Sequence, residues 1–282
     1  MTKHVLREAL AKFIEEDLGK GDITSEIVAS DKTVRAKIVC KERALVAGLN
    51  EAGVLFDLVK CRSKPLVREG RCVRPMTTIM TVSGNARSIL SAERTVLNFL
   101  MRMSGIATET RRFVDEVRRI NPRVKIACTR KTAPGLRIFD KRAVSVGGGE
   151  THRMRLDEMV LIKDNHLAIA GSVSKTVRLA KRMHGSKAKV EVEVRSLRQA
   201  MDAVDAGADI IMLDNLTARQ VHSIVKALES KHMRERVTIE VSGGITHKNI
   251  RQYASADVDL ISIGSITHSI KSIDMSLEVT GK

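Results

Sequence analysis

Apolar side chains in the first hundred residues switch between helical and strand-like spacing. Leu6, Leu10, Phe13 and Ile14 fall on one helical face, which predicts an amphipathic helix over residues 4–18. Shorter apolar runs bounded by turn residues predict further strands and helices, with strands at 34–39, 44–47 and 77–82 and helices at 50–59 and 86–103. Ser104-Gly105 is expected to interrupt the last of these helices. Together the elements predict a mixed α+β domain over residues 1–105.

The rhythm changes after residue 106, where strand-like and helical stretches begin to alternate. The predicted strands are Val124–Thr129, Ala143–Gly147, Val160–Lys163, Val190–Val194, Ile210–Leu213, Val237–Val241 and Leu260–Ile263. Because helical stretches lie between most of them, the pattern indicates a parallel sheet. We expect an α/β fold in which residues 106–265 form an incomplete α/β barrel of about seven strands. Residues 266–282 are expected to pack back on the N-terminal domain. An open doubly wound sheet is the alternative, and no GxGxxG motif supports a dinucleotide site.

Composition narrows the function classes. The 282 residues carry a formal net charge of +16, which suits either nucleic acid or a small anionic substrate. Only 2% of residues are aromatic, and proteins that bind single strands stack bases on aromatic rings, so nucleic acid is not expected as the main partner. No apolar run reaches the length of a membrane span. The four cysteines are widely spaced and form no zinc motif, which favours a reduced, cytoplasmic protein.

Cationic side chains gather at the ends of the first predicted barrel strands. The members of this group are Arg130, Lys131, His152, Arg153 and Lys163, with Gly147-Gly148-Gly149 before the histidine. Carboxyl ends of parallel strands meet at one face of a barrel, where active sites are built. Converging cations repel one another unless an anion lies among them, so the pattern predicts a site for a small polyanion. Surface ion pairs are the alternative for any one of these residues.

Two isolated carboxylates follow along the rim. Glu191 and Glu193 share one side of their strand, and Asp214 ends the next strand. Mg²⁺ prefers oxygen ligands and is often shared with substrate phosphates, so Glu193 and Asp214 are candidates for a Mg²⁺-diphosphate or ribose-hydroxyl site. Pairing of these carboxylates with barrel Lys or Arg side chains is the alternative.

The last strands end in small residues. Ser242-Gly243-Gly244 lies between a predicted strand and a predicted helix start, and Gly264-Ser265 holds the same place one strand later. Exposed backbone N–H groups together with a helix N-terminus bind phosphate, and a phosphate site in the last loops is a recurrent barrel arrangement. A simple tight turn is the alternative for either diglycine-like segment.

Several longer motifs resemble the quinolinate phosphoribosyltransferase family in collinear order over nearly the whole chain. They are Gly19 to Thr24, Glu93 to Asn98, Ser104 to Thr108, Thr129-Arg130-Lys131-Thr132, Gly147 to Gly149 with His152-Arg153, Leu161 to His166, Glu191 to Val194, Met212 to Asn215, Glu240 to Ile245 and Ser262 to His268. One departure is Glu150-Thr151 before His152, where many relatives have Asn next to the histidine. It bears on fine substrate contacts alone.

The resemblance implies an α/β N-terminal domain on an incomplete barrel of the phosphoribosyltransferase type. It implies an enzyme that converts quinolinate and phosphoribosyl pyrophosphate to nicotinate mononucleotide, pyrophosphate and CO2 with Mg²⁺, in de novo NAD biosynthesis. The resemblance assigns quinolinate to Arg94, Arg130, Lys131, His152, Arg153 and Lys163, ribose and metal to Glu193 and Asp214, and the 5′-phosphate to Ser242, Gly243, Gly244, Gly264 and His268, with Thr129 and Ser265 as further substrate-binding residues. Of these, Lys131, Lys163, Glu193 and Asp214 are expected to be catalytic.

The resemblance also implies a homodimer in which Arg94 reaches the partner's site. The alternatives are a phosphoribosyltransferase for nicotinate or another pyridine acid without decarboxylation, and, more remotely, a basic barrel that binds nucleic acid without catalysis. A pyridine with one carboxylate needs fewer cations, so the set His152, Arg153 and Lys163 favours the dicarboxylate.

Overall fold

The computed structural model describes residues 3–185 and 187–281, and its contacts divide the chain into two compact units. The first unit takes the chain up to Glu109 together with Ile270 onward, and the second unit spans Thr110–Ser269. Both junctions fall four residues later than the expected boundaries at 105 and 265. Hydrogen bonds explain the shift: Leu45 N–H donates to Thr108 Oγ1 over 2.8 Å in the first unit, and Thr267 Oγ1 donates to the Lys131 carbonyl over 2.8 Å in the second.

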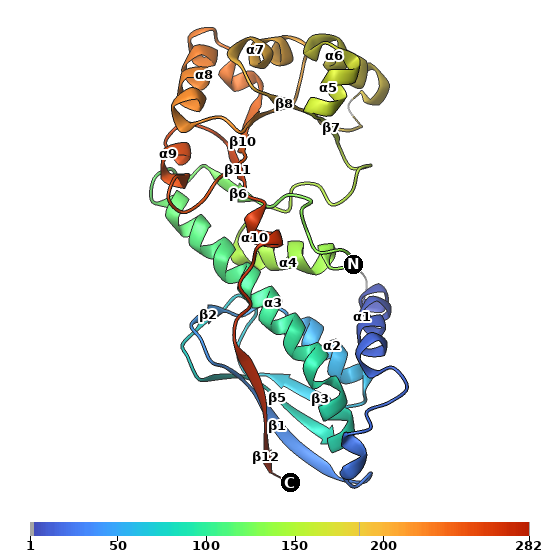
Figure 1. Cartoon of the computed structure of the whole chain (residues 1–282). Coiled ribbons are helices and arrows are strands. Elements are labelled where there is room, and N and C mark those ends of the chain that lie inside the picture. Colours follow the sequence, from blue (N-terminus) through green and yellow to red (C-terminus); the bar gives the residue numbers. More distant parts are fainter. Residues whose placement is uncertain (1–2, 186, 282) are drawn as a thin grey trace. The chain divides into compact units, whose positions relative to one another are not determined.

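The first unit is built on a four-stranded antiparallel sheet of order β12-β1-β5-β3 (Figure 1). Its strands are β1 (Thr33–Cys40), β3 (Arg62–Pro65), β5 (Thr77–Asn85) and β12 (Met275–Gly281), and a separate pair joins β2 (Ala44–Leu45) to β4 (Cys72–Val73). Val34, Ala36 and Ile38 alternate with more exposed residues along β1, so one face of the sheet is buried. The helices include α1 (Lys3–Leu18), the 3₁₀ turn η1 (Ser25–Ile27) and α2 (Leu49–Leu58).

Helix α3 (Ala86–Arg118) runs without interruption through Ser104-Gly105, so the predicted break there is wrong. Ser104 is buried, and its hydroxyl accepts a hydrogen bond from Ala47 N–H over 3.0 Å. A Cβ on Gly105 would lie 2.3 Å from the Lys271 carbonyl oxygen. The small residues therefore allow other backbone segments to approach the helix closely.

The second unit contains a six-stranded sheet in which every neighbouring pair is parallel. The order is β6-β11-β10-β9-β8-β7, with β6 (Lys125–Ala127), β7 (Val160–Ile162), β8 (Val190–Val194), β9 (Ile210–Asp214), β10 (Thr238–Ser242) and β11 (Leu260–Ser262). Six of the predicted strands are thereby confirmed. All five β8 residues are buried, as expected for a strand covered on both faces.

The predicted strand Ala143–Gly147 is wrong, because these residues end helix α4 (Arg137–Gly147). Phe139, Ala143 and Val144 are all buried and follow helical spacing, whereas the last five residues viewed alone look like a short apolar run. A single parallel bridge between Ala127 and Glu150 takes the place of a seventh strand beside β6. Within the described residues the sheet thus has six strands, one fewer than the seven expected.

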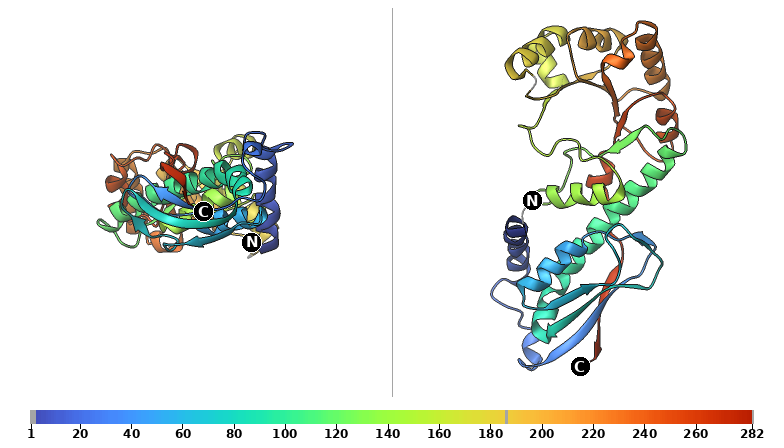
Figure 2. Two further views of the ribbon diagram at one scale, coloured as in Figure 1. Left: turned by 90° about the horizontal axis from the view of Figure 1, so that it is seen from below. Right: turned by 180° about the vertical axis from the view of Figure 1, so that it is seen from behind.

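Helices α5 (Asp164–Ala170), α6 (Val173–His184), α7 (Leu197–Asp205) and α8 (Ala218–Ser230) follow successive strands and lie on the outer side of this sheet (Figure 2). Side-chain oxygens of Ser172, Ser196 and Thr217 cap α6, α7 and α8. The shorter η2 (Arg234–Arg236), α9 (Ile250–Ala254) and α10 (Ser265–His268) complete the unit. None of the described helices combines the length and apolar character that a membrane-spanning segment needs.

Candidate active site

A cavity of about 560 Å³ opens at the carboxyl ends of the strands in the second unit. Eleven of the predicted site residues line it, namely Thr129, Arg130, Lys131, His152, Arg153, Lys163, Glu193, Asp214, Ser242, Gly243 and Gly244. They come from six different strand ends or loops, which is the arrangement expected for the catalytic face of a barrel. The sequence pattern therefore located one contiguous concave site.

Four predicted site residues are not among those that line the cavity: Arg94, Gly264, Ser265 and His268. Arg94 is exposed on α3 in the first unit. Gly264 adjoins the cavity wall, since a Cβ there would lie 3.1 Å from Lys131 Cδ and 3.2 Å from the His268 ring. Gly264 therefore leaves room for Lys131 and His268 to lie next to each other.

Two arginines crowd one side of the cavity. The Arg153 side chain is buried, and its Nη1 donates to the Met159 carbonyl over 3.3 Å. Burial and the neighbouring Arg130 guanidinium both lower the pKa of Arg153, which means that this charge lacks full compensation. Arg130 Nε is buried and has no hydrogen-bond partner among the described residues. Arg130 thus has a buried donor without a partner, and it lies near Arg153, whose charge is not fully balanced. This combination indicates a site for an anion.

Helix α4 holds the segment that carries His152 and Arg153. The Lys141 side chain is 1% exposed, and its Nζ donates to the carbonyls of Thr151 and Arg153 over 2.5 and 2.6 Å. Burial lowers the pKa of Lys141, so the two carbonyls stabilise an ammonium that the interior disfavours. His152 itself has a φ of +53°, a left-handed conformation that few residues other than glycine adopt. Lys141 thus holds the carbonyls of the two residues on either side of this strained position.

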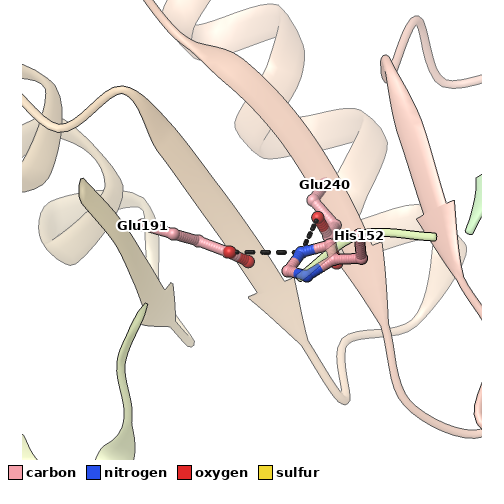
Figure 3. A group of neighbouring side chains, drawn as sticks. All are labelled: His152, Glu191 and Glu240. Carbon is pink, nitrogen blue, oxygen red and sulfur yellow. Dashed lines mark hydrogen bonds and ion pairs between the residues drawn. The ribbon is translucent and has the colours of Figure 1, made fainter. Parts of the chain in front are cut away.

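The His152 ring reaches Glu191 on β8 and Glu240 on β10 (Figure 3). Both carboxylates are completely buried, and Ser262 Oγ donates to Glu240 Oε1. A metal ion could be held by three or more His, Cys, Asp or Glu side chains whose ligand atoms lie within 4.8 Å of one another. Among the described residues, His152, Glu191 and Glu240 form the one such group. The hydrogen bond from His152 Nε2 to Glu240 over 3.2 Å already explains why the ring and the carboxylate lie so close together without a metal ion.

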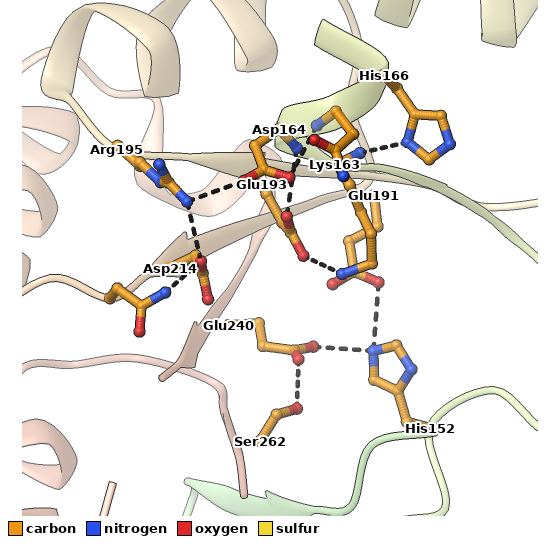
Figure 4. A network of polar contacts seen from close by, with 12 residues as sticks. His152, Lys163, Asp164, His166, Glu191, Glu193, Arg195, Asp214, Glu240 and Ser262 are labelled. Carbon is orange, nitrogen blue, oxygen red and sulfur yellow. Dashed lines mark hydrogen bonds and ion pairs between the residues drawn. The ribbon is translucent and has the colours of Figure 1, made fainter. Parts of the chain in front are cut away.

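The carboxylates Glu193 and Asp214 pair with cations of the same rim (Figure 4). Lys163 Nζ contacts Glu193 Oε1, and the Asp164 N–H donates to Glu193 Oε2 over 3.4 Å. Asp214 Oδ2 accepts from Asn215 Nδ2 over 2.7 Å and lies 3.8 Å from Arg195 Nη2. The ion-pair alternative therefore holds for Glu193, while Asp214 keeps a looser cationic contact.

The glycine loop after β10 has an unusual backbone. Gly243 and Gly244 have φ values of +95° and +61°. A Cβ at Gly243 would lie 2.2 Å from Asn215 Oδ1, so only glycine fits. The expected helix start after this loop is wrong, because α9 begins only at Ile250 and spans five residues. Any phosphate held here would contact loop N–H groups rather than a helix end.

Comparison with known families assigns both parts of the chain. Residues 22–104 match the model described as "Quinolinate phosphoribosyl transferase, N-terminal domain", and residues 106–278 match the corresponding C-terminal domain. The chain belongs to the quinolinate phosphoribosyltransferase family. The motif at Gly19 to Thr24 only partly falls inside the matched range.

Relatives of this family match over nearly their whole length. The chain is 44% identical over 259 residues to the "Probable nicotinate-nucleotide pyrophosphorylase [carboxylating]" of Archaeoglobus fulgidus, covering 92% of this chain and 98% of that protein. It is 35% identical to the "Nicotinate-nucleotide pyrophosphorylase [carboxylating]" of Rattus norvegicus, over 95% of this chain and 88% of that one. The solved structure "Crystal Structure of NadC from Streptococcus pyogenes" superposes with a TM-score of 0.93 at 34% identity, covering 100% and 99% of the two chains.

In this member of the quinolinate phosphoribosyltransferase family, sequence reasoning missed several cavity residues. Arg195 directly follows β8 and could have been found by the same strand-end rule that gave Lys163. Glu240 alternates with Ser242 on β10, so its inward position could have been inferred from strand periodicity. Lys141, which does not line the cavity but holds the His152 segment, left no comparable signal, since a lysine on a helix is ordinarily a surface residue.

Proposed function

We propose that the protein transfers the phosphoribosyl group of phosphoribosyl pyrophosphate to quinolinate, giving nicotinate mononucleotide, pyrophosphate and CO2. The observation that carries this proposal is the crowded pair Arg130 and Arg153 in the cavity, with a buried Arg130 Nε lacking a partner among the described residues. A ligand with two carboxylates supplies the compensation that this pair lacks. The names of the Archaeoglobus fulgidus and Rattus norvegicus relatives support the same reaction.

The cationic side of the cavity would bind quinolinate. Arg130 and Arg153 offer forked donors for the carboxylates, while Lys131 and His152 add charge from the adjacent loops. Thr129 Oγ1 accepts from Lys131 N–H over 3.1 Å, which braces the turn that presents this lysine. Lys163 would complete the set by exchanging its contact with Glu193 for one with substrate.

Glu193 and Asp214 would face the ribose and the diphosphate. Two carboxylates at adjacent strand ends suit Mg²⁺, which is usually held by one or two carboxylates plus substrate phosphates. The donor set fits an ion that arrives with the diphosphate better than a resident one, since both residues also have cationic neighbours. When bound, Mg²⁺ supplies charge neutralisation of the leaving pyrophosphate.

The loops with Ser242, Gly243 and Gly244 and with Gly264 and Ser265 would bind the 5′-phosphate. The two consecutive left-handed glycines turn the backbone of the first loop, which lines the cavity, and such concave turns bind anions through N–H groups. His268 adjoins Gly264 and would add a donor from α10.

The chemistry then follows from the placement of charge. The pyridine nitrogen attacks the anomeric carbon as pyrophosphate leaves, and carboxylates near the ribose stabilise the positive charge that develops there. The ring nitrogen becomes cationic, so the bond from C2 to its carboxylate can break with the electron pair left beside that charge. CO2 leaves, and a proton replaces it at C2. Juxtaposition of the two anionic substrates in one cavity supplies much of the remaining rate enhancement.

The proposal includes a cytoplasmic homodimer. An exposed arginine at position 94, outside the cavity lining of its own chain, would enter the cavity of the partner subunit. A covering subunit would exclude water from a cavity rich in charge and strengthen every electrostatic contact in it.

An assay of nicotinate mononucleotide formation tests the proposal. Purified protein with Mg²⁺ and phosphoribosyl pyrophosphate receives either quinolinate or nicotinate, and the product nucleotide and labelled CO2 are measured. Quinolinate should support turnover with one CO2 per nucleotide. Equal turnover of nicotinate would instead indicate the non-decarboxylating alternative, and no nucleotide from either substrate would reject both.

A further inference from the structure

The contact between His152 and two buried carboxylates lies at the inner wall of the cavity. His152 Nε2 is 3.2 Å from Glu240 Oε2 and 3.2 Å from Glu191 Oε2 (Figure 3). The side chains of both glutamates are 0% exposed and that of His152 is 9% exposed. His152 and Glu240 line the cavity, whereas Glu191 does not. Carboxylates are rarely buried unless they have a polar partner, so packing alone does not explain why two of them lie behind this imidazole.

The two carboxylates have different relations to the ring. One N–H points at only one acceptor with good geometry, and His152 Nε2 donates to Glu240. Glu191 lies at ion-pair distance, and both of its oxygens lack a hydrogen-bond partner among the described residues. Ser262 Oγ donates to the second oxygen of Glu240 and thereby fixes the carboxylate plane. The chain Ser262–Glu240–His152 therefore orients the ring, while Glu191 lies at ion-pair distance from it; burial and the neighbouring Glu240 raise the pKa of Glu191.

The two carboxylates occupy one nitrogen of a ring that lines the cavity. Figure 3 shows both contacts meeting at Nε2, so Nδ1 is the ring nitrogen left to contact a ligand. Burial opposes protonation of His152, but the close contacts with the Glu191 carboxylate on β8 and the hydrogen-bonded Glu240 carboxylate on β10 outweigh it and raise the pKa to about 9. At neutral pH both nitrogens then carry a proton, and Nδ1–H is a charged donor.

We propose that Glu240, held by Ser262, positions His152 so that its Nδ1–H is presented to a carboxylate of the pyridine substrate. Glu240 is a positioning residue that acts through His152. Only the identity of the bound carboxylate rests on the proposed function. The left-handed backbone of His152 agrees with this role, because such conformations persist where surrounding contacts enforce them.

The first test needs no substrate. The ring ¹⁵N signals of His152, assigned by their loss in His152→Asn, are titrated by NMR in the wild type and in Glu240→Gln. Glutamine keeps an acceptor for Nε2–H but removes the charge. The wild-type ring should remain protonated well above pH 7, and Glu240→Gln should lower its titration midpoint by about one to three pH units. Ser262→Ala should change the Nε2 shift that reports the hydrogen bond. An unchanged midpoint in Glu240→Gln overturns the proposal.

The second test separates positioning from general damage. In Glu240→Gln the KM for quinolinate at pH 8 should rise about 10- to 100-fold, the loss expected for one charge-assisted contact. The KM for phosphoribosyl pyrophosphate should stay unchanged. Glu229→Gln, an exposed position on α8, is the matched control. An equal rise in both KM values would indicate a structural role and overturn the proposal. If the wild type turns over no quinolinate, the proposed function fails, whereas the NMR titration still decides the role of Glu240.

Discussion

Replacing Lys141 by methionine should loosen the His152 segment and destabilise the second unit. Methionine is of similar length and carries no charge, so it removes the ammonium that holds the carbonyls of Thr151 and Arg153. Each carbonyl left without a partner costs about 1–3 kcal/mol. Relief of the unfavourable burial of the ammonium offsets part of this loss, because burial lowers the pKa of Lys141. We expect the free energy of unfolding to fall by about 2–5 kcal/mol.

The chain offers a selective probe for this measurement. It contains one tyrosine and no tryptophan, and Tyr253 is buried in the second unit, where its hydroxyl donates to the Leu216 carbonyl over 2.9 Å. Urea unfolding followed by tyrosine fluorescence therefore reports on the second unit. Lys226→Met makes the same chemical change at an exposed position on α8 and should alter stability by less than about 0.5 kcal/mol. If Lys141→Met is as stable as this control, the ammonium does not hold the segment.

Four further outcomes are expected. Gly105→Ala should destabilise the first unit by about 1–3 kcal/mol, because the new methyl group would meet the Lys271 carbonyl; circular dichroism during urea unfolding measures this, and wild-type stability would contradict the close approach. Arg153→Ala should raise the KM for quinolinate by about 10-fold or more while leaving the fold intact, and near wild-type kinetics would show that the cationic subsite is misplaced. Asp214→Asn should lower turnover and shift its Mg²⁺ dependence, and an identical Mg²⁺ profile with full turnover would remove it from the metal and ribose role. Inactive Arg94→Ala and Arg153→Ala proteins should regain activity when mixed, since one of the two sites in a mixed dimer keeps both arginines; verified subunit exchange without activity would exclude action across the interface.

The sequence predicted the parallel sheet because each strand of the second unit is a short apolar run between turn signals. It failed at α4, where the apolar run Ala143–Gly147 is the C-terminal part of a helix and is too short to show a helical period by itself. It failed again at Ser104-Gly105, because the reason for two small residues lies in backbone segments distant in sequence. Propensity describes neighbours along the chain, whereas these positions are decided by tertiary contacts.

The candidate site was also predicted where local sequence signals suffice and missed where tertiary contacts decide. Residues at strand ends were found because topology brings strand ends together. The contact between Lys163 and Glu193 remained one of two alternatives, since charge type alone does not tell whether a carboxylate faces a substrate or a lysine. Contacts that hold the site residues in place, such as the hydrogen bond between Ser262 and Glu240, depend on which side chains meet inside the barrel. Neighbouring residues in the sequence give no signal of them.

Strand β12 has a consequence for synthesis of the chain. It pairs with β1 from Arg35↔Gly281 to Cys40↔Met275, so the sheet of the first unit is completed by residues that are synthesised after the whole second unit. Until then the edge of β1 opposite β5 has no partner strand in this sheet, and such edges are templates for aggregation. The first unit therefore cannot complete its sheet before the second unit has been synthesised, whereas domains usually fold in order from the N-terminus. Premature termination after the second unit would leave that edge uncovered permanently.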